Sequence, residues 1–268
     1  MSLISRLHRN PLHNTAHYHP YMARYHEEGF TVLDHYRHLR QILFIYQALE
    51  IKLQDPAFSP KLPDDLDLSF ALNRSAAIQN DLAFLKPLIP LVYQNEILPA
   101  TREYAEQIRS IDVSTNEGRN QLFSHFLIRI LGDLFGGQGL KSCAITAYQK
   151  AGIYQDKDPV PGTEQYHFRP GALKDFSSWL NRLELNDEQE NDIVRHADDA
   201  YQKHINLFSD LESTRPASAV PKPFTAKTSV AQNTSSFFSC NTLTKAAAVG
   251  ALALSTGLVI TAAITRLT

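Results

Sequence analysis

The sequence contains few cysteines and almost no excess charge. Only two cysteines occur among 268 residues, Cys143 and Cys240, which is too few for the disulfide framework of a small secreted protein. This scarcity predicts a reducing compartment. The formal net charge is −2 and no basic run is present, so the composition gives no electrostatic reason to expect a nucleic-acid partner.

Other familiar patterns are also missing. Residues 1–14 contain basic side chains but no apolar stretch of signal-peptide length, so we do not expect export by a cleaved signal. No dinucleotide-binding glycine fingerprint and no clustered cysteines occur, which predicts no intrinsic flavin, NAD(P)H or iron–sulfur site. Strand patterns are almost absent, while 43% of the residues are hydrophobic, enough for a sizeable core.

Regularly spaced apolar residues predict the helices of this core. From Glu27 to Lys52 they recur at intervals of three to four residues, which is typical of an amphipathic helix. Further helices are expected over residues 64–85, from Pro99, which suits a first helical turn, and after Asn186, a common N-cap residue. Together they predict one all-α domain over residues 1–212.

The longest predicted helix contains a run of glycines. Ser114 and Glu117 have capping-box spacing, and the helix that they begin should extend some thirty residues to Lys150. Within it, the segment "RILGDLFGGQGL" contains Gly132, Gly136, Gly137 and Gly139. Each glycine inside a helix costs about 1 kcal/mol relative to alanine. The bare backbone must therefore serve something other than helix stability.

Three of these glycines share one helix face, because Gly132, Gly136 and Gly139 lie at i, i+4 and i+7. Such a face can pack closely on another helix, or it can lie against a flat ligand such as a porphyrin. Asp133 lies beside it, one turn after Arg129 at salt-bridge spacing. A carboxylate would be unfavourable in a pure packing interface, so the pattern favours the ligand.

The composition changes after residue 212. Residues 213–244 are rich in Ser, Thr, Pro and Ala without periodicity, which predicts a flexible linker. Residues 246–265 are uncharged, and twenty helical residues rise about 30 Å, enough to cross a bilayer core. We predict a membrane anchor within residues 245–268 that holds the domain on the cytosolic face of a membrane. An amphipathic or disordered tail is the alternative.

Two separate blocks resemble one known family. "SHFLIRILGDLFGGQGL" resembles the distal-helix signature of heme oxygenases, and "LHNTAHYHPYM" followed by "GFTVLDHYRHLRQILFIYQALE" is similar to their proximal and second helices. Weaker matches are "NDLAF" and "AYQKHINLFSDLE", and the C-terminal anchor resembles the layout of microsomal members. The resemblance covers nearly all of residues 6–212. It implies an all-α fold that holds heme between a proximal helix and a glycine-rich distal helix.

The resemblance also implies roles for individual residues on the proximal side. His13 would be the axial ligand of the heme iron, through a neutral imidazole nitrogen. Basic residues at two family positions would bind the propionates, and three side chains would pack around the macrocycle. The propionate-binding residues would be Arg6 and Lys174, and the packing residues Met22, Tyr201 and Phe208.

On the distal side, Gly132 and Gly136 would line the heme face. The resemblance implies that Asp133 anchors a water network that delivers protons to the reaction. Arg129 would hold Asp133 in place, and Tyr46 would join the same network.

The chain departs from the family pattern at several positions. Leu127 stands where a tyrosine is common, and Ser177 or Ser178 stands where a basic propionate-binding residue is common. Phe135 replaces a small residue of the glycine signature. Pro11 falls two residues before the predicted iron ligand, so the proximal helix should start late or kink, with Asn10 as its N-cap. These changes bear on heme affinity and regiochemistry more than on the fold.

The leading hypothesis is an enzyme that uses O2 to open heme to biliverdin, with release of iron and carbon monoxide. Heme b would be both cofactor and substrate, and a reductase or ferredoxin would supply the electrons. A non-catalytic, membrane-tethered heme-binding protein is the alternative that the altered propionate positions suggest. A helical scaffold that holds zinc through His13 and His17 is a third hypothesis, based on a weak spacing signal.

Overall fold

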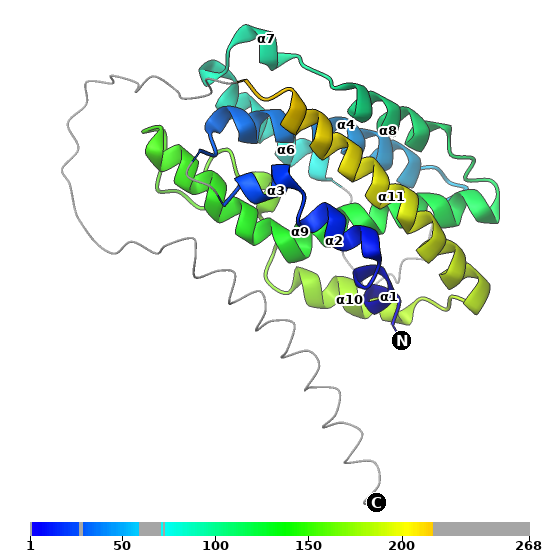
Figure 1. The fold of residues 1–268 in the computed structure, drawn as a ribbon. Coiled ribbons are helices and arrows are strands. Elements are labelled where there is room, and N and C mark those ends of the chain that lie inside the picture. Colours follow the sequence, from blue (N-terminus) through cyan, green and yellow to red (C-terminus); the bar gives the residue numbers. More distant parts are fainter. Residues whose placement is uncertain (1, 27–28, 59–70, 72, 217–268) are drawn as a thin grey trace, which may run out of the picture. The chain divides into compact units, whose positions relative to one another are not determined.

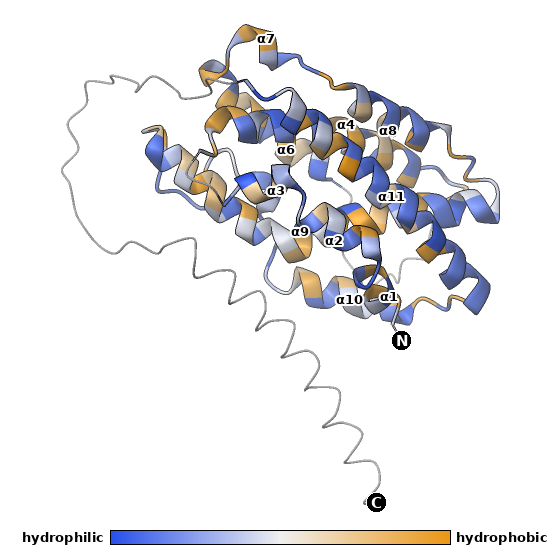
Figure 2. Cartoon of the chain, in the orientation of Figure 1, coloured by the Kyte–Doolittle hydropathy of each residue, from blue (hydrophilic) through white to orange (hydrophobic). Residues whose placement is uncertain are grey.

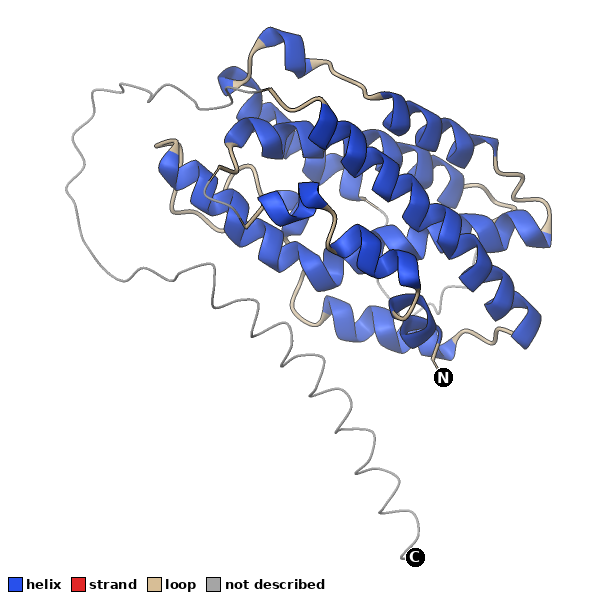
Figure 3. Ribbon diagram, viewed as in Figure 1, coloured by secondary structure: helices blue, strands red, loops and turns tan. Residues whose placement is uncertain are grey.

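The computed structural model describes residues 2–26, 29–58, 71 and 73–216. The chain divides into two compact units, Met1–Phe224 and Thr225–Thr268, and the second lies wholly outside the described residues. Every regular element in the described part is a helix (Figure 3). The prediction of an all-α domain is therefore confirmed for this part of the chain.

The N-terminal region forms three short helices, α1 (Leu3–His8), α2 (Pro11–His17) and α3 (Pro20–Arg24). Asn10 caps α2, because its side-chain oxygen accepts a hydrogen bond from the Leu12 amide at 2.9 Å. Pro11 occupies the first turn, where a missing N–H costs nothing. The late start predicted for the proximal helix is confirmed.

Three long helices form the framework of the domain: α4 (Val32–Leu53), α9 (Asn116–Lys150) and α11 (Asp187–Ser213). In Figure 1, α11 runs across α9, and it also contacts the three N-terminal helices. α4 starts five residues later than the pattern from Glu27 predicts. The reason is a capping box, in which Thr31 accepts from the Asp34 amide at 3.2 Å and Asp34 accepts from the Thr31 amide at 3.0 Å.

α9 is continuous through its glycines for 35 residues. Its N-cap is Thr115 and not Ser114, so the predicted capping box was wrong by one residue. The Ser114 hydroxyl donates to Asp112 at 2.6 Å instead, while the Thr115 hydroxyl accepts from the Gly118 amide at 3.0 Å. Both hydroxyls donate to Asp112, that of Ser114 to the carboxylate and that of Thr115 to the backbone carbonyl at 3.0 Å. Of the two, Thr115 is the one that accepts from an amide of the first turn.

α11 begins as predicted at Asn186, which forms a reciprocal capping box with Gln189. Its apolar stripe faces the core, with Ile193, Ala197 and Phe208 all buried. Figure 2 shows that the opposite, outward side of α11 is largely hydrophilic. Burial of the apolar side holds α11 against α9 and α8.

Shorter helices complete the described domain. They are α6 (Arg74–Leu85), η1 (Lys86–Leu88), α7 (Leu91–Gln94), α8 (Pro99–Ser110), η2 (Glu164–Tyr166) and α10 (Ala172–Arg182). The helix predicted over residues 64–85 is present as α6, whereas residues 64–70 and 72 lie outside the described residues. α8 begins at Pro99 as predicted. The sequence analysis did not predict α10, which packs its Trp179 and Phe176 against α9.

No helix within the described ranges is long and apolar enough to cross a membrane. The linker predicted over residues 213–244 begins later than expected, because Ser213 still belongs to α11 and Arg215 pairs with Asp34. Residues 217–244 and the predicted anchor at residues 246–265 lie outside the described ranges.

Candidate active site

The predicted iron ligand His13 lies on α2 beside α11. Its ring meets Tyr201 edge to face, with the two ring centroids 5.9 Å apart. Nδ1 of His13 is buried and has no hydrogen-bond partner in the described residues. Burial, with the neighbouring His8 and His17 rings, lowers the pKa of His13. The imidazole is therefore neutral at neutral pH, which is the form that binds a metal ion.

The other histidines near His13 form a row along the first two helices. The ring of His8 lies 4.5 Å from that of His13, and the ring of His17 stacks on it at 6.0 Å with an interplanar angle of 9°. Within the described ranges, no three His, Cys, Asp or Glu side chains are placed to share one metal ion.

The four glycines between residues 132 and 139 of α9 serve two different purposes. A Cβ atom added at Gly136 or Gly139 would meet no heavy atom within 4 Å, and one at Gly132 would meet only Nη2 of Arg129, at 3.8 Å. A Cβ at Gly137, in contrast, would lie 3.2 Å from the Tyr166 ring. Gly137 therefore permits close packing of η2, whereas the other three glycines of the run leave an open face.

A buried polar triad stands beside this open face. Asp133 is 1% exposed, and each of its carboxylate oxygens is bound. Nη2 of Arg129 donates to Oδ1, while the Tyr46 hydroxyl, from α4, donates to Oδ2. The structure thus brings together the three residues that the sequence analysis placed in one network. Their roles in proton delivery stay predictions.

Burial and the Asp133 carboxylate raise the pKa of Tyr46 well above its usual value. Burial alone would lower the pKa of Arg129, but Asp133 and Tyr46 outweigh it, so the net change is upward. At neutral pH the phenol therefore keeps its proton and the guanidinium keeps its charge. Asp133 thus has two permanent donors, and it is held rigidly beside Gly132.

Sequence reasoning missed a group of buried polar residues around Arg129. The Tyr104 hydroxyl lies 3.2 Å from Nδ1 of His125, and the ring of Tyr104 meets that of His204 at 5.2 Å. Burial, with the nearby Arg129 charge, lowers the pKa of His204 to about 3. The same two causes lower the pKa of His38. These histidines are neutral, so they add polarity to the interior without adding charge.

The side chains predicted to pack around the macrocycle lie in different surroundings. Tyr201 is buried near His13, and its hydroxyl donates to the Leu7 carbonyl at 3.2 Å. Phe208 stacks on Tyr21 at 5.8 Å and on His38 at 6.2 Å. Met22 is half-buried on α3. Of these three residues, the structure places Tyr201 against His13.

The predicted propionate-binding residues lie on α1 and α10. Arg6 pairs with Glu190 at 3.1 Å and donates to Asn191 at 2.7 Å, so its guanidinium holds α1 to the start of α11. Lys174 and Ser178 are exposed on α10, and Ser177 is half-buried. The propionate-binding roles stay predictions.

Two departures from the family pattern can now be located in the fold. Leu127 is fully buried in α9, and Phe135 is 51% exposed. The extra bulk of Phe135 therefore lies at the surface beside the glycines and not in the packed core.

The family model for heme oxygenase matches residues 5–210. A heme oxygenase of Takifugu rubripes is 30% identical over 190 residues, which cover 69% of this chain and 65% of that protein. Heme oxygenase 1 of Nostoc is 28% identical over 174 residues, which cover 63% of this chain and 68% of that protein. The chain thus spans about two thirds of these curated relatives.

Solved structures show the same fold. Heme oxygenase-2 of Synechocystis, in complex with heme and NO, is 25% identical, with a TM-score of 0.65 over 80% of this chain and 86% of that chain. Heme oxygenase-1 of the same organism, in complex with heme, is 23% identical, with a TM-score of 0.61 over 80% and 93%. Because the family model covers most of the chain, this protein belongs to the heme oxygenase family.

Proposed function

We propose that this chain is a heme-degrading enzyme that uses O2 and external electrons to convert heme to biliverdin, iron and carbon monoxide. The observation that carries the proposal is the buried Arg129–Asp133–Tyr46 triad beside an open glycine face. A protein that only stored heme would have no use for a fixed carboxylate at this place, and burial of such a group is costly.

The residues present fit heme as the substrate. His13 offers a neutral imidazole for iron, and Gly132 and Gly136 offer a wall without side chains for the porphyrin plane. The Tyr201 ring packs edge to face against the ring of His13, the proposed ligand. Heme, when bound, would supply the iron that takes up O2 and the porphyrin edge that becomes oxidised.

The contribution of the chain is then to orient water and to move protons. Both oxygens of Asp133 accept hydrogen bonds from donors that stay protonated at neutral pH, so the position and the direction of the carboxylate are fixed. An immobile acceptor next to Gly132 can hold a water molecule over the glycine face and relay protons through it. The phenol of Tyr46 steadies this acceptor and is too weak an acid to give up its own proton.

Electrons would come from a reductase or ferredoxin. We also propose that residues 246–265 anchor the domain to the cytosolic face of a membrane through the linker that follows Pro216 and extends to residue 244. The lack of charge and the length of this segment support the anchor. The test is flotation of the full chain with phosphatidylcholine vesicles, compared with a chain ended at residue 216. Equal recovery of both chains in the soluble fraction would refute the anchor.

The main experiment follows the visible spectrum of the purified chain with one equivalent of heme. The expected result is a heme absorption band that, on addition of a reductase, NADPH and air, gives way to the bands of a bilin. His13→Ala should abolish the initial heme band, and the matched variant His17→Ala should keep it. A wild-type complex whose heme band survives many turnovers of the reductase would show a heme-binding protein and not an enzyme.

A further inference from the structure

The tip of the domain at α7 exposes apolar side chains. Leu91 and Val92 are 82% and 75% exposed, and Leu88, at the end of η1, is 40% exposed. We call these three residues the apolar tip. Figure 2 shows hydrophobic colour on α7 at the edge of the domain. A cluster of exposed large apolar residues is uncommon on a soluble surface and indicates a contact site.

The apolar tip is held in a defined conformation. The Gln94 side chain donates to the carbonyls of Ile89 at 2.8 Å and Lys86 at 3.2 Å, which closes the turn on itself. The Tyr36 hydroxyl of α4 donates to the Gln94 carbonyl at 3.1 Å. These hydrogen bonds therefore hold the turn in a conformation that leaves Leu91 and Val92 exposed to solvent.

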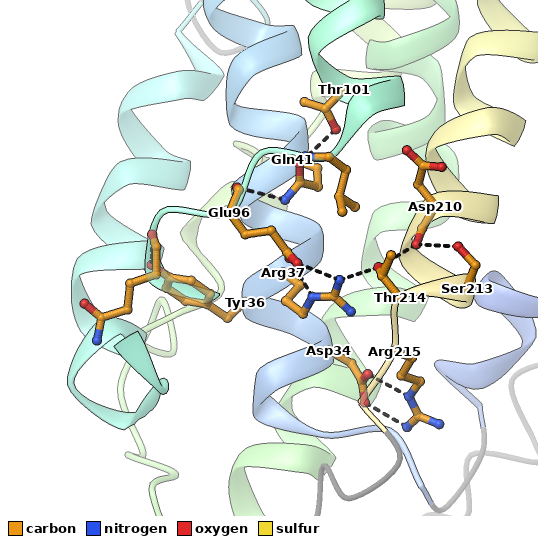
Figure 4. A network of polar contacts seen from close by, with 12 residues as sticks. Asp34, Tyr36, Arg37, Gln41, Glu96, Thr101, Asp210, Ser213, Thr214 and Arg215 are labelled. Carbon is orange, nitrogen blue, oxygen red and sulfur yellow. Dashed lines mark hydrogen bonds and ion pairs between the residues drawn. The ribbon is translucent and has the colours of Figure 1, made fainter. Parts of the chain in front are cut away.

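The same scaffold fastens the end of α11. Nε of the buried Arg37 donates to Glu96, just after α7, at 2.7 Å, and its Nη2 donates to Thr214 at 2.6 Å (Figure 4). The next residue, Arg215, pairs with Asp34 at 2.8 Å. One guanidinium thus links Glu96, which follows α7, and Thr214, which follows α11, to the same end of α4.

We propose that the apolar tip inserts into the interface of the bilayer that holds the predicted anchor. This inference rests on the anchor of the proposed function. About thirty residues separate Pro216 from the uncharged segment, and the flexible linker that their composition predicts would span about 30 Å. The end of α11 would therefore stay close to the bilayer, at a high effective concentration for even a weak contact.

The chemistry of the segment suits a lipid surface. The sequence "KPLIPLVYQN" contains one charge, that of Lys86, and no acidic residue. Lysine can extend to phosphate groups while leucine and valine enter the upper acyl region. Tyrosine is a residue type enriched at membrane interfaces, and Tyr93 is half-buried beside the apolar tip.

Tryptophan fluorescence in the full chain tests the contact. The only native tryptophan, Trp179, is 1% exposed in the core and gives a constant background. Val92→Trp would place the probe in the apolar tip. Ile51→Trp is the matched control, because Ile51 is also apolar and 64% exposed but lies about 20 Å farther along α4 than Arg37. Both variants would be reconstituted into phosphatidylcholine–phosphatidylserine vesicles, with and without brominated phosphatidylcholine.

Insertion predicts that brominated lipid quenches the added emission of Val92→Trp about twofold or more and leaves that of Ile51→Trp within about 10%. Equal emission of Val92→Trp in both kinds of vesicle, from chains that float with them, would overturn the contact while the anchor stands. A blue shift in the Val92→Trp emission that grows with protein concentration, without quenching by brominated lipid, would show that a second copy of the chain covers the apolar tip. This result would also overturn the lipid contact. If the full chain fails to float, both the membrane anchor and the lipid contact are refuted. The heme assay tests the enzymatic activity separately, so this result does not bear on the proposed enzyme.

Discussion

Tyr46 and Asp133 are joined by a buried hydrogen bond although 87 positions separate them in the chain. The bond connects α4 to α9 at the place where the glycine face begins. Each carboxylate oxygen of Asp133 therefore has a donor, because Arg129 binds the oxygen that Tyr46 does not. The position of the carboxylate is thus set by two helices together, and helix α9 alone could not fix it.

Tyr46→Phe should lower the free energy of unfolding of the heme-free protein by about 1.5–3 kcal/mol, because a buried bond to a charged acceptor is lost. Urea denaturation measures this change. Tyr36→Phe, on the same helix, is the matched control. It removes a hydrogen bond to the neutral Gln94 carbonyl and should cost about 1 kcal/mol. Equal losses in both variants would contradict a charged acceptor at position 133.

Asp133→Asn should bind heme with an unchanged absorption band. It should form bilin at a rate lower by a factor of about 100 or more, since proton relays typically contribute factors of this order. Asparagine keeps an oxygen acceptor for Arg129, so the fold should survive. Asp133→Ala would leave a buried guanidinium unpaired and is expected to cost about 3–5 kcal/mol of stability. Stopped-flow spectra of the preformed heme complex give the rate, and a wild-type rate in Asp133→Asn would refute the proton role.

Local patterns predicted those parts of the site that lie within one helix. The spacing of Arg129 and Asp133 follows from helix geometry alone, and so does the shared face of the three open glycines. Asn186 and Asn10 were also predictable, because N-caps are read from short stretches of sequence. The partnership of Tyr46 with Asp133 came only through the family resemblance, since no local pattern spans two helices.

The parts that could not be predicted depend on packing between distant segments. His38 and His204 look like ordinary polar positions in an amphipathic pattern, yet both are buried near Arg129. Their burial is decided by α4, α9 and α11 meeting in space. The apolar tip was missed for a similar reason, because its exposure follows from the scaffold around Arg37 and not from its composition.

Gly136→Ala should stabilise the heme-free protein by about 0.5–1 kcal/mol, because alanine is the better helix former and the added methyl meets no atom. The same methyl should weaken heme binding about tenfold, or about 1.4 kcal/mol. Urea denaturation and heme titration measure the two effects. Gly118→Ala is the contrasting control, because its Cβ would lie 1.9 Å from the Asp112 carbonyl oxygen and should destabilise the fold. Unchanged heme affinity in Gly136→Ala would show that α9 does not line the heme.

The stability of the domain should fall as pH decreases from 7.5 to 5.5. Burial lowers the pKa of His35 to about 3, where its ring nitrogens contact the hydroxyls of Tyr148 at 2.6 Å and Tyr166 at 3.3 Å. The unfolded chain has a histidine pKa of about 6.5 and so takes up the proton that the folded state refuses, which favours unfolding. The contribution of His35 is fully present above pH 6.5 and is lost progressively as pH falls toward 3.

This loss amounts to about 1.4 kcal/mol for one such histidine between pH 7.5 and 5.5. His35→Gln cannot take up a proton in either state, so its free energy of unfolding should depend on pH less steeply by that amount, whatever the cost of the substitution at pH 7.5. Urea denaturation of wild type and variant at the two pH values measures the difference. The same pH dependence in both proteins would mean that His35 is already charged in the fold or stays neutral when unfolded, and would contradict its burial as a neutral ring between two tyrosines.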